Sequence, residues 1–305
     1  MKEISRMTLG TVQLGLDYGI SNTEGKPDDI KAFSILDKAI EKGINCLDTA
    51  AGYGDSEEVI GRWLKQSGTK RKDLSIATKF RLGNIEKRDV EYDLIGSVET
   101  SLVRMGTDYV DFLLMHDAGE YGKYGREIDS AIKKLIDQGC VKAAGASGYD
   151  YDGISEIVEN DMYSVFQIPV NILDYRITGT EAEGKLHGKT IFARSIYLQG
   201  LFFRDPDTLT GNLKEISFYI KKIRSIADKY SYSIARLATG YVNSLGYIDS
   251  LVIGADNPGH VRDNADLLEK PKYAGDFMEM MKSELGGAPD WLFYPWNWDK
   301  QEVMG

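Results

Sequence analysis

Short apolar runs alternate with longer amphipathic segments along nearly the whole chain. We predict strands from the apolar runs at positions 7–14, 44–47, 74–80, 109–116, 141–146, 165–169, 190–195 and 250–253. Between them, apolar residues recur every three to four positions, as Phe33, Leu36 and Ile40 do, which is typical of helices with one buried face. Asp55-Ser56-Glu57-Glu58 matches a capping box, and Asn257-Pro258 matches a helix start.

Strand and helix signals that alternate eight times, with no linker or internal repeat, favour an α/β fold of the (β/α)₈ TIM-barrel type. We expect one domain over residues 1–305, with 271–305 as a C-terminal tail. The alternative is an open doubly wound sheet, which would carry a glycine-rich phosphate-binding turn after an early strand. Only Gly10 stands in the Leu9-Gly10-Thr11 stretch, so the barrel is preferred.

Composition narrows the function classes. The chain of 305 residues carries a formal net charge of −10, which disfavours nucleic acid or an anionic membrane as the main partner. No run approaches the ~18 apolar residues of a membrane span, and the N-terminus lacks a signal-peptide core, so we expect a cytoplasmic protein. Cys46 and Cys140 both lie in apolar runs and indicate core residues, without a disulfide framework or metal site. The oligomeric state stays open.

Polar residues that could take part in catalysis stand where predicted strands end. These are Asp48, Tyr53 in the loop that follows, Lys79 and His116. Each type alone usually has a structural role: a rim lysine, a packed tyrosine, a hydrogen-bonding histidine. In a barrel, however, the C-terminal ends of adjacent strands converge, so we expect these side chains to lie together.

The four residue types suit proton transfer. A free phenol has a pKa near ~10, and a nearby ammonium lowers it. Lys79 can supply that charge, and a buried lysine needs an anionic partner such as Asp48. His116 can donate a hydrogen bond to a carbonyl oxygen that gains negative charge. Such a relay requires hydride from a dissociable cofactor.

Asp48-Thr49-Ala50 with Tyr53-Gly54, Thr78-Lys79 and the 113–116 segment together resemble the aldo-keto reductase superfamily, over residues 9–268. The resemblance implies a TIM barrel that reduces a small-molecule aldehyde or ketone with NAD(P)H. It makes Asp48, Tyr53, Lys79 and His116 the catalytic tetrad, with Tyr53 as general acid. The alternative is a nucleotide-binding barrel with little turnover that senses redox state for a partner protein.

The resemblance also implies a cofactor site. Ser147 and Gln167 match the pair that holds the nicotinamide carboxamide, the 195–200 loop matches the pyrophosphate segment, and Asn264 is expected at the adenine. The expected cofactor-binding residues are Gly10, Thr11, Ser147, Gln167, Arg194, Ser195, Ile196, Tyr197, Leu198, Gly200, Ile253, Gly254, Ala255, Asp256, His260 and Asn264.

Two positions depart from the family pattern. Arg194 stands where many members stack an aromatic ring on the nicotinamide, and it should disfavour the cationic, oxidised form; alternatively it pairs with a carboxylate and points elsewhere. Asp256 stands where NADP-selective members have a basic residue, with His260 and Arg262 further on. A carboxylate there favours a ribose hydroxyl over a phosphate, unless it only caps the next helix. The resemblance to the family implies NADP(H) as the cofactor, and Asp256 makes NAD(H) the alternative.

Aromatic residues are the candidates for the substrate side. Tyr18, Phe80 and Trp291 could line a pocket and stack on a sugar ring or an apolar chain. Alternatively, the aromatic tail packs on the barrel exterior. The 9–19 segment is also similar to bacterial members associated with sugar or surface-polysaccharide metabolism, which suggests a sugar-derived carbonyl.

Overall fold

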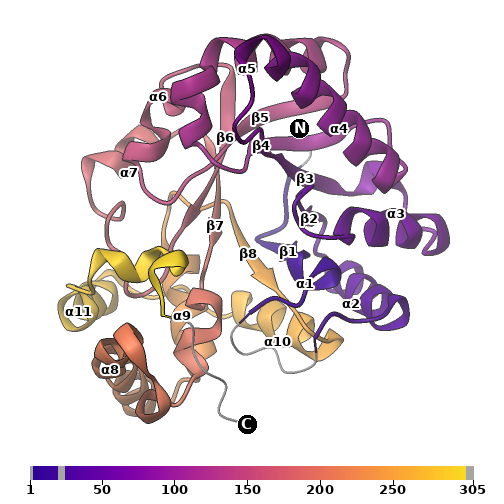
Figure 1. Cartoon of the computed structure of the whole chain (residues 1–305). Helices are drawn as coiled ribbons and strands as arrows, with labels where there is room; N and C mark the ends of the chain where they lie inside the picture. Colours follow the sequence, from indigo (N-terminus) through magenta and orange to yellow (C-terminus); the bar gives the residue numbers. More distant parts are fainter. Residues whose placement is uncertain (1–2, 20–24, 300–305) are drawn as a thin grey trace.

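The computed structural model describes residues 3–19 and 25–299, and within them eight parallel strands close into one barrel (Figure 1). Each strand pairs with its successor and β1 pairs with β8, which confirms the predicted TIM barrel. The strands are β1 Met7–Gly10, β2 Cys46–Asp48, β3 Ser75–Phe80, β4 Val110–Met115, β5 Val141–Ser147, β6 Tyr163–Pro169, β7 Thr190–Arg194 and β8 Ser250–Gly254.

Helices surround the strands on the outside of the barrel, as Figure 1 shows. They are α1 Val12–Gly15, α2 Asp29–Glu41, α3 Ser56–Gln66, α4 Val90–Met105, α5 Gly119–Asp137, α6 Ser155–Val158, α7 Glu181–Lys185, α8 Ser217–Lys229, α9 Ile234–Ser244, α10 Pro258–Leu268 and α11 Gly275–Leu285. Short 3₁₀ segments are η1 Arg71–Asp73, η2 Lys87–Asp89, η3 Asp152–Ile154, η4 Leu198–Phe203, η5 Pro206–Thr208, η6 Gly211–Ile216, η7 Asp290–Phe293 and η8 Pro295–Asn297. Both α8 and α9 lie between β7 and β8, so the chain after β7 makes its longest excursion before it returns to the barrel.

Local sequence explains where several helices begin. The Asp28 carboxylate accepts a hydrogen bond from the Lys31 backbone N–H and caps α2. Asn257 caps α10 in the same way, through the His260 N–H, with Pro258 at the first helical position as expected. The capping box expected at α3 is wrong: Asp55 makes no side-chain capping bond and pairs with Lys26 instead.

The first strand is shorter than the apolar run predicted. It ends at Gly10, and residues 12–15 form α1. The Thr11 backbone N–H bonds to the Asp48 carbonyl at 2.9 Å, and the Leu16 N–H bonds to the Val12 carbonyl, which closes the helical turn. The apolar residue Leu14 is therefore buried beneath a helical turn and does not continue the strand.

A small cluster fills the interior of the barrel, separate from the large core between strands and helices. Its members are Cys46, Ala77, Phe112, Leu114, Ala143, Val165 and Phe192. Phe112 and Phe192 meet edge to face across the barrel, with ring centroids 5.4 Å apart. Side chains on a strand alternate between faces, so the residue two positions after an interior residue also points inward.

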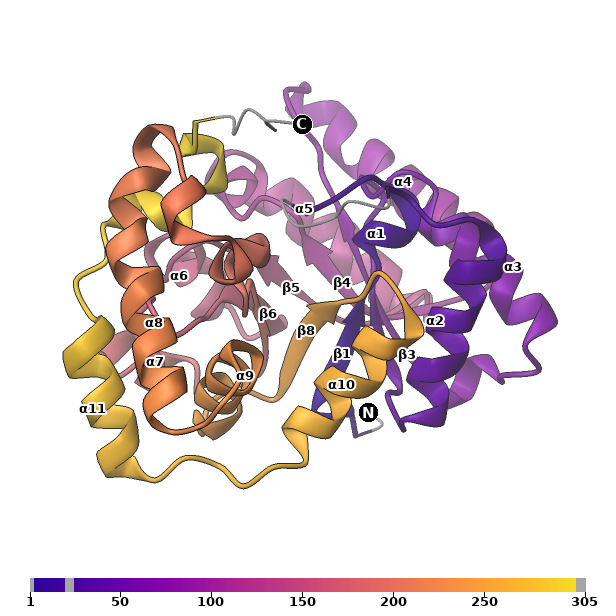
Figure 2. The same ribbon diagram turned by 90° about the horizontal axis from the view of Figure 1, so that it is seen from below.

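The C-terminal segment returns to the end of the barrel where the strands finish. Helix α11 packs against α8, and the chain after α11 then reaches the same end of the molecule as α1 (Figure 2). Among residues 3–19 and 25–299, no helix combines the length and apolarity that crossing a membrane needs.

Candidate active site

Strand alternation places the candidate residues directly above the interior cluster. Cys46 leads to Asp48 two positions on, Ala77 to Lys79, Val165 to Gln167 and Phe192 to Arg194. Leu114 likewise leads to His116, and Ala143 leads through Gly145 to Ser147. The interior of the barrel is therefore apolar beneath a polar layer, and the structure brings the four tetrad candidates together at its C-terminal end, as the sequence predicted.

The Lys79 ammonium is fully buried between oxygen acceptors. It donates to the Asp48 Oδ1 at 2.7 Å and to the Thr49 carbonyl at 3.0 Å. The Gln167 Nε2 donates to the same Asp48 oxygen at 2.8 Å. Burial is the largest single influence and opposes the charged form of Lys79, but Asp48 and Tyr53 together outweigh it, so the pKa of Lys79 is raised. Lys79 therefore stays an ammonium inside the barrel.

The Tyr53 phenol sits against this ammonium. Its Oη lies 3.4 Å from the Lys79 Nζ, which also lies 4.8 Å from the ring centroid. Burial raises the pKa of Tyr53, and the Lys79 charge opposes that rise. The expected effect of Lys79 has the right direction, but burial outweighs it in this site, so the phenol keeps its proton at neutral pH and can act as a donor.

His116 faces Tyr53 from the end of β4. The two rings meet edge to face, with centroids 5.6 Å apart and an interplanar angle of 83°. Burial, together with the nearby Lys79 charge, lowers the pKa of His116 to about 4. The imidazole is therefore neutral near pH 7 and offers one N–H donor and no positive charge.

Three buried hydroxyl groups hold the loop that carries Tyr53. The Ser56 Oγ donates to the Thr11 carbonyl at 2.9 Å and lies 2.8 Å from the Thr11 Oγ1. Thr49 donates to Ser56 at 3.0 Å, and the Thr11 Oγ1 donates to the Asp48 carbonyl at 2.9 Å. These contacts join the loop after β1 to the loop after β2. The sequence indicated Ser56 only as part of a capping box, because its contacts with Thr11 depend on pairing between the two loops.

Glu57 belongs to the same support. The expected capping role is replaced by a buried contact, in which the Thr78 hydroxyl donates to its carboxylate at 2.7 Å. Arg104 on α4 approaches the other carboxylate oxygen at 3.3 Å. Glu57 thereby ties α3 to β3 directly beside Lys79.

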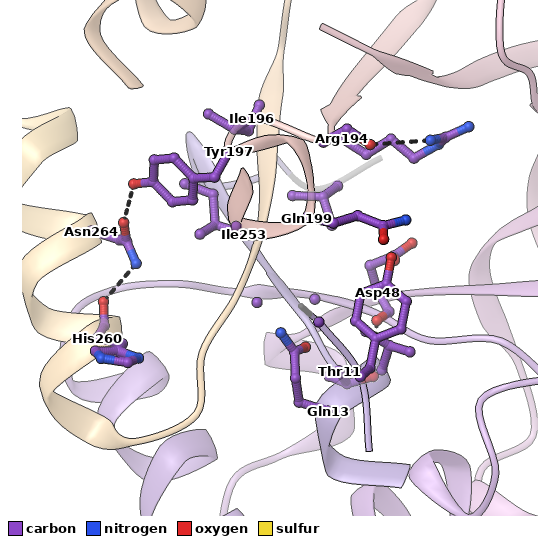
Figure 3. Close-up of a pocket in the computed structure, with 18 of the residues that line it drawn as sticks. Thr11, Gln13, Asp48, Arg194, Ile196, Tyr197, Gln199, Ile253, His260 and Asn264 are labelled. Atoms are coloured by element: carbon purple, nitrogen blue, oxygen red, sulfur yellow. Dashed lines mark hydrogen bonds between the residues drawn. The ribbon is translucent and has the colours of Figure 1, made fainter. Parts of the chain in front are cut away.

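A cavity of about 720 Å³ opens above the tetrad and runs toward the start of α10 (Figure 3). Of the predicted site residues, those that line it are Gly10, Thr11, Tyr18, Asp48, Tyr53, His116, Ser147, Gln167, Arg194, Ser195, Ile196, Tyr197, Gly200, Ile253, Gly254, Asp256, His260 and Asn264. Gln199, within the predicted 195–200 loop, and Asp263, beside the expected Asn264, also line it. The lining residues that we did not predict are Val12, Gln13, Gly19, Tyr149, Phe203, Ala235, Val252 and Leu267.

Five predicted residues lie outside the cavity wall. One is Lys79, which is buried against Asp48 just below it. Phe80 follows Lys79 on β3 and therefore faces the helices, where it is buried in the outer core. Leu198 and Ala255 are buried in the same core. Trp291 is half-buried and packs against that core from the tail. Of the three residues expected on the substrate side, the structure therefore brings only Tyr18 to the cavity wall among the described residues.

The cavity has features that fit a dinucleotide. Ser147 and Gln167 are paired neighbours on β5 and β6, at the level of the tetrad. The loop after β7 turns tightly, with positive φ at Ser195, Gln199 and Gly200. Gly254 lies against the Gln13 carboxamide, and a Cβ there would come within 2.3 Å of it, so the Gln13 side chain would have to move. Backbone geometry thus shapes the loop after β7, and the Gln13 side chain packs on the wall at Gly254.

At the far end, Asn264 is already oriented. The Tyr197 hydroxyl donates to its Oδ1, and its Nδ2 donates to the His260 carbonyl at 2.8 Å (Figure 3). Asp256 lies 3.7 Å from the His260 ring nitrogen. Since Asn257 caps α10, the capping role considered for Asp256 belongs to its neighbour. Arg262 pairs with Asp263 at the surface and is not part of the cavity wall.

Arg194 lies at the tetrad end of the cavity. Its guanidinium carbon is 4.2 Å from the Tyr149 ring centroid, and its nitrogens donate to the Gly148 carbonyl at 3.0 Å and to the Ser195 Oγ at 3.2 Å. The carboxylate partner considered for it is not found within the described part of the chain. Tyr149 therefore occupies one face of the guanidinium.

Comparison with known proteins agrees with this geometry. The chain is similar to the aldo-keto reductase YhdN of Bacillus subtilis (26% identity over 283 residues, 85% of this chain and 83% of the relative). It is also similar to the aldo-keto reductase str7 of Strobilurus tenacellus (26% over 288 residues, 87% and 83%). Its fold matches that of the holo form of aldo-keto reductase AKR11C1 from Bacillus halodurans (TM-score 0.75, 22% identity, 92% of each chain).

The model of the Aldo/keto reductase family matches residues 6–284, which is nearly the whole chain. The family and the fold imply an oxidoreductase that reduces carbonyl compounds with a nicotinamide cofactor. On these grounds the chain belongs to the Aldo/keto reductase family.

Proposed function

We propose that this protein reduces an aldehyde or ketone to an alcohol, with Tyr53 as the general acid. The observation that carries the proposal is the buried Lys79–Asp48 pair, 2.7 Å apart, with the Tyr53 phenol against its ammonium at the floor of the cavity. A buried ion pair is a poor device for stability alone, because desolvation offsets much of its attraction. Its position beside a phenol supports a role in proton transfer.

The side chains divide the work at the carbonyl oxygen. Tyr53 donates its proton to this oxygen, and Lys79 stabilises the phenolate that remains. Asp48 keeps Lys79 charged and in place through its 2.7 Å contact. The neutral His116 donates a second hydrogen bond to the substrate oxygen and orients the carbonyl. The reduced nicotinamide, when bound, supplies the hydride.

We assign cofactor roles to residues of the cavity wall. We expect Ser147 and Gln167 to hold the nicotinamide carboxamide, the 195–200 loop the pyrophosphate, and Asn264 the adenine, and their position along one cavity supports this. Gln167 already donates to Asp48 through Nε2, so its carbonyl oxygen remains for the amide N–H of the ligand. One residue thus links the cofactor site to the tetrad.

The charge at the adenosine end favours NAD(H). Asp256 and Asp263 line that end, and His260 is its one lining side chain that can become positive among the described residues. A 2′-phosphate brings further negative charge next to carboxylates, whereas a 2′-hydroxyl can donate to one. Family habit favours NADP(H), but the local charges lead us to infer that NAD(H) binds at least as tightly.

The test is Tyr53→Phe, which removes only the hydroxyl. Loss of a general acid costs about 10²- to 10⁴-fold in rate. We expect that loss in NADH or NADPH oxidation with a panel of sugar-derived and simple aldehydes, while cofactor fluorescence titration gives an unchanged Kd. Unchanged turnover would disprove the role of Tyr53. Tight cofactor binding by the wild-type protein without turnover of any carbonyl would favour the nucleotide-sensing alternative.

A further inference from the structure

Arg194 brings a positive charge to the part of the cavity where the substrate must enter. Burial raises the pKa of the Tyr18 phenol to about 12 and also that of Tyr53, and the Arg194 charge opposes both rises, so the guanidinium acts directly on the tetrad end. Figure 3 places it across the cavity from Asn264 and His260. The adenosine end is therefore not its target.

The guanidinium has unused donors. Of its five N–H groups, the described part of the chain occupies two, one with the Gly148 carbonyl and one with the Ser195 hydroxyl. Its charge is balanced by no carboxylate among residues 3–19 and 25–299. A planar guanidinium with free donors is suited to bidentate binding of a carboxylate or phosphate.

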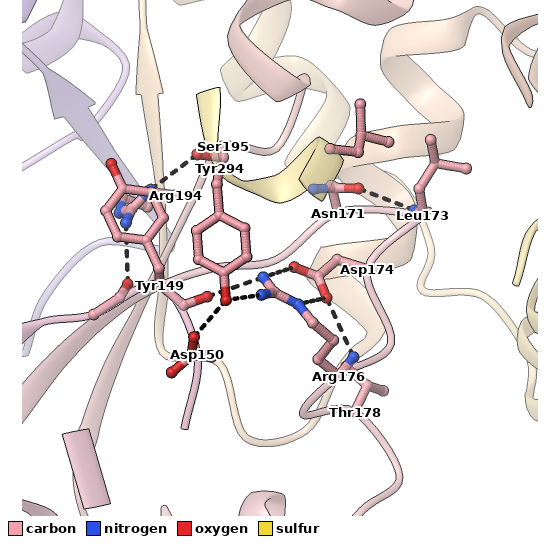
Figure 4. Close-up of polar contacts among 12 residues, drawn as sticks. Tyr149, Asp150, Asn171, Leu173, Asp174, Arg176, Thr178, Arg194, Ser195 and Tyr294 are labelled. Carbon is pink, nitrogen blue, oxygen red and sulfur yellow. Dashed lines mark hydrogen bonds and ion pairs between the residues drawn. The ribbon is translucent and has the colours of Figure 1, made fainter. Parts of the chain in front are cut away.

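One face of the Arg194 guanidinium lies against the Tyr149 ring, and Tyr149 is itself held by a hydrogen bond from Arg176. The Arg176 Nη2 donates to the Tyr149 carbonyl at 2.9 Å (Figure 4). Arg176 in turn donates two hydrogen bonds to the Asp174 carboxylate, from Nε at 2.9 Å and from Nη2 at 2.8 Å. The loop after β6 thus anchors the loop after β5.

The C-terminal tail completes this support. The Tyr294 hydroxyl donates to Asp150 at 2.5 Å and accepts from Arg176 at 3.0 Å. Trp296 meets the Tyr149 ring at 4.5 Å, at an interplanar angle of 79°. Arg194 is therefore held in place before any ligand arrives, which lowers the entropy that binding must cost.

We propose that Arg194 recognises an anionic group, a carboxylate or a phosphate, on the carbonyl substrate. The inference rests on the proposed carbonyl reduction and adds the substrate class: a small oxo compound that carries a negative charge within reach of its carbonyl. Tyr18 and Tyr149 line the cavity beside this charge and supply apolar walls. An acidic sugar derivative or a short oxo acid meets both requirements.

Matched aldehydes test the charge. 4-Carboxybenzaldehyde and 4-nitrobenzaldehyde have nearly the same shape and differ in charge; D-glyceraldehyde 3-phosphate and D-glyceraldehyde form the phosphate pair. The readout is the ratio of kcat/KM within each pair, for the wild type and for Arg194→Met. Charge-assisted hydrogen bonds of this kind correspond to about 10- to 100-fold, so we expect the preference for the charged member to fall by that factor.

Two variants serve as controls. Arg194→Lys keeps the charge without the planar fork and should retain part of the preference. Arg62→Met removes an exposed arginine that pairs with Asp29, remote from the cavity, and should leave the ratio unchanged. Equal losses for both members of each pair in Arg194→Met would overturn the inference. So would a weakened Kd for NADH with unchanged ratios, because Arg194 would then serve the cofactor.

A binding measurement separates this inference from the proposed function. Calorimetric titration of the cofactor-loaded protein compares 4-(hydroxymethyl)benzoate with 4-nitrobenzyl alcohol. We expect tighter binding of the carboxylate in the wild type and in Arg194→Lys, and no difference in Arg194→Met. If no aldehyde is reduced but this pattern holds, carbonyl reduction fails and anion recognition stands. If the wild type binds both compounds equally, anion recognition fails whatever the turnover.

Discussion

Gly15 is the point where the loop after β1 touches the loop that carries Tyr53. A Cβ on Gly15 would lie 1.8 Å from the Tyr53 carbonyl oxygen and 2.6 Å from the Ser56 backbone nitrogen. Ordinary contact begins at 3.4 Å, so Gly15→Ala requires the two loops to separate by about 1.6 Å, the difference between 3.4 and 1.8 Å. Both contacts are to backbone atoms, and no side-chain rotation can relieve them.

This displacement predicts losses in both stability and rate. Overpacking of a tight contact costs about 1–3 kcal/mol, and the buried Ser56 hydroxyl network would be strained along with it. The Tyr53 phenol would move away from the Lys79 ammonium, now 3.4 Å away. Misplacement of a catalytic group by ~1 Å can cost 10²-fold in rate, so we expect kcat/KM to fall by about that factor.

The assay combines urea unfolding with steady-state reduction of an aldehyde. The matched control is Gly96→Ala in α4, where a Cβ would meet nothing within 4 Å. Since alanine is the better helix former, that variant should gain up to ~1 kcal/mol and keep its activity. If Gly15→Ala proved as stable and as active as Gly96→Ala, the two loops would not be rigidly coupled and the argument would be refuted.

Three further changes probe the charges of the site. Lys79→Met leaves Asp48 as an uncompensated buried charge and should cost about 3–5 kcal/mol in urea unfolding; adding Asp48→Asn should restore most of that stability but no activity. His116 has a pKa of about 4 in the folded protein and about 6.5 unfolded, so the unfolded chain binds the proton first; stability should fall by up to ~3 kcal/mol as pH drops from 6.5 to 4, and this component should be absent in His116→Asn. Asp256→Arg should raise the affinity for NADPH relative to NADH by more than about 10-fold in fluorescence titrations, and an unchanged ratio would contradict the assigned adenosine end.

The fold was predictable because strand and helix periodicity persists through the chain, and eight alternating strand and helix signals are enough to indicate a barrel. The tetrad was predictable for a related reason. Asp48 and Lys79 stand two positions after the small interior residues Cys46 and Ala77, so the pleat alone turns them inward. The same alternation explains why the prediction for Phe80 was wrong. Phe80 follows Lys79 at the end of β3, so its side chain faces the helices and not the cavity.

Other parts depend on contacts that no local pattern records. The apolar stretch after Gly10 suits a strand and a short helix equally, and pairing of Thr11 with the Asp48 carbonyl decides for the helix. Glu57 satisfies a capping pattern, but its carboxylate is bound by Thr78, which lies 21 residues away. In both cases a tertiary hydrogen bond outweighs the local preference.

The surroundings of Arg194 likewise depend on tertiary contacts that no local sequence pattern records. Arg176 and Tyr294 lie 118 residues apart, and through them the tail fixes Tyr149, whose ring covers Arg194. The Asp48–Lys79 pair thus rests on strand positions, whereas Arg194, itself the last residue of β7, is held by contacts with loops that the tail supports. If Arg194 recognises the substrate as we propose, changes in these loops and the tail should alter which carbonyl compound is accepted while Asp48 and Lys79 keep their geometry. For that reason the sequence indicates the reaction more directly than it indicates the substrate.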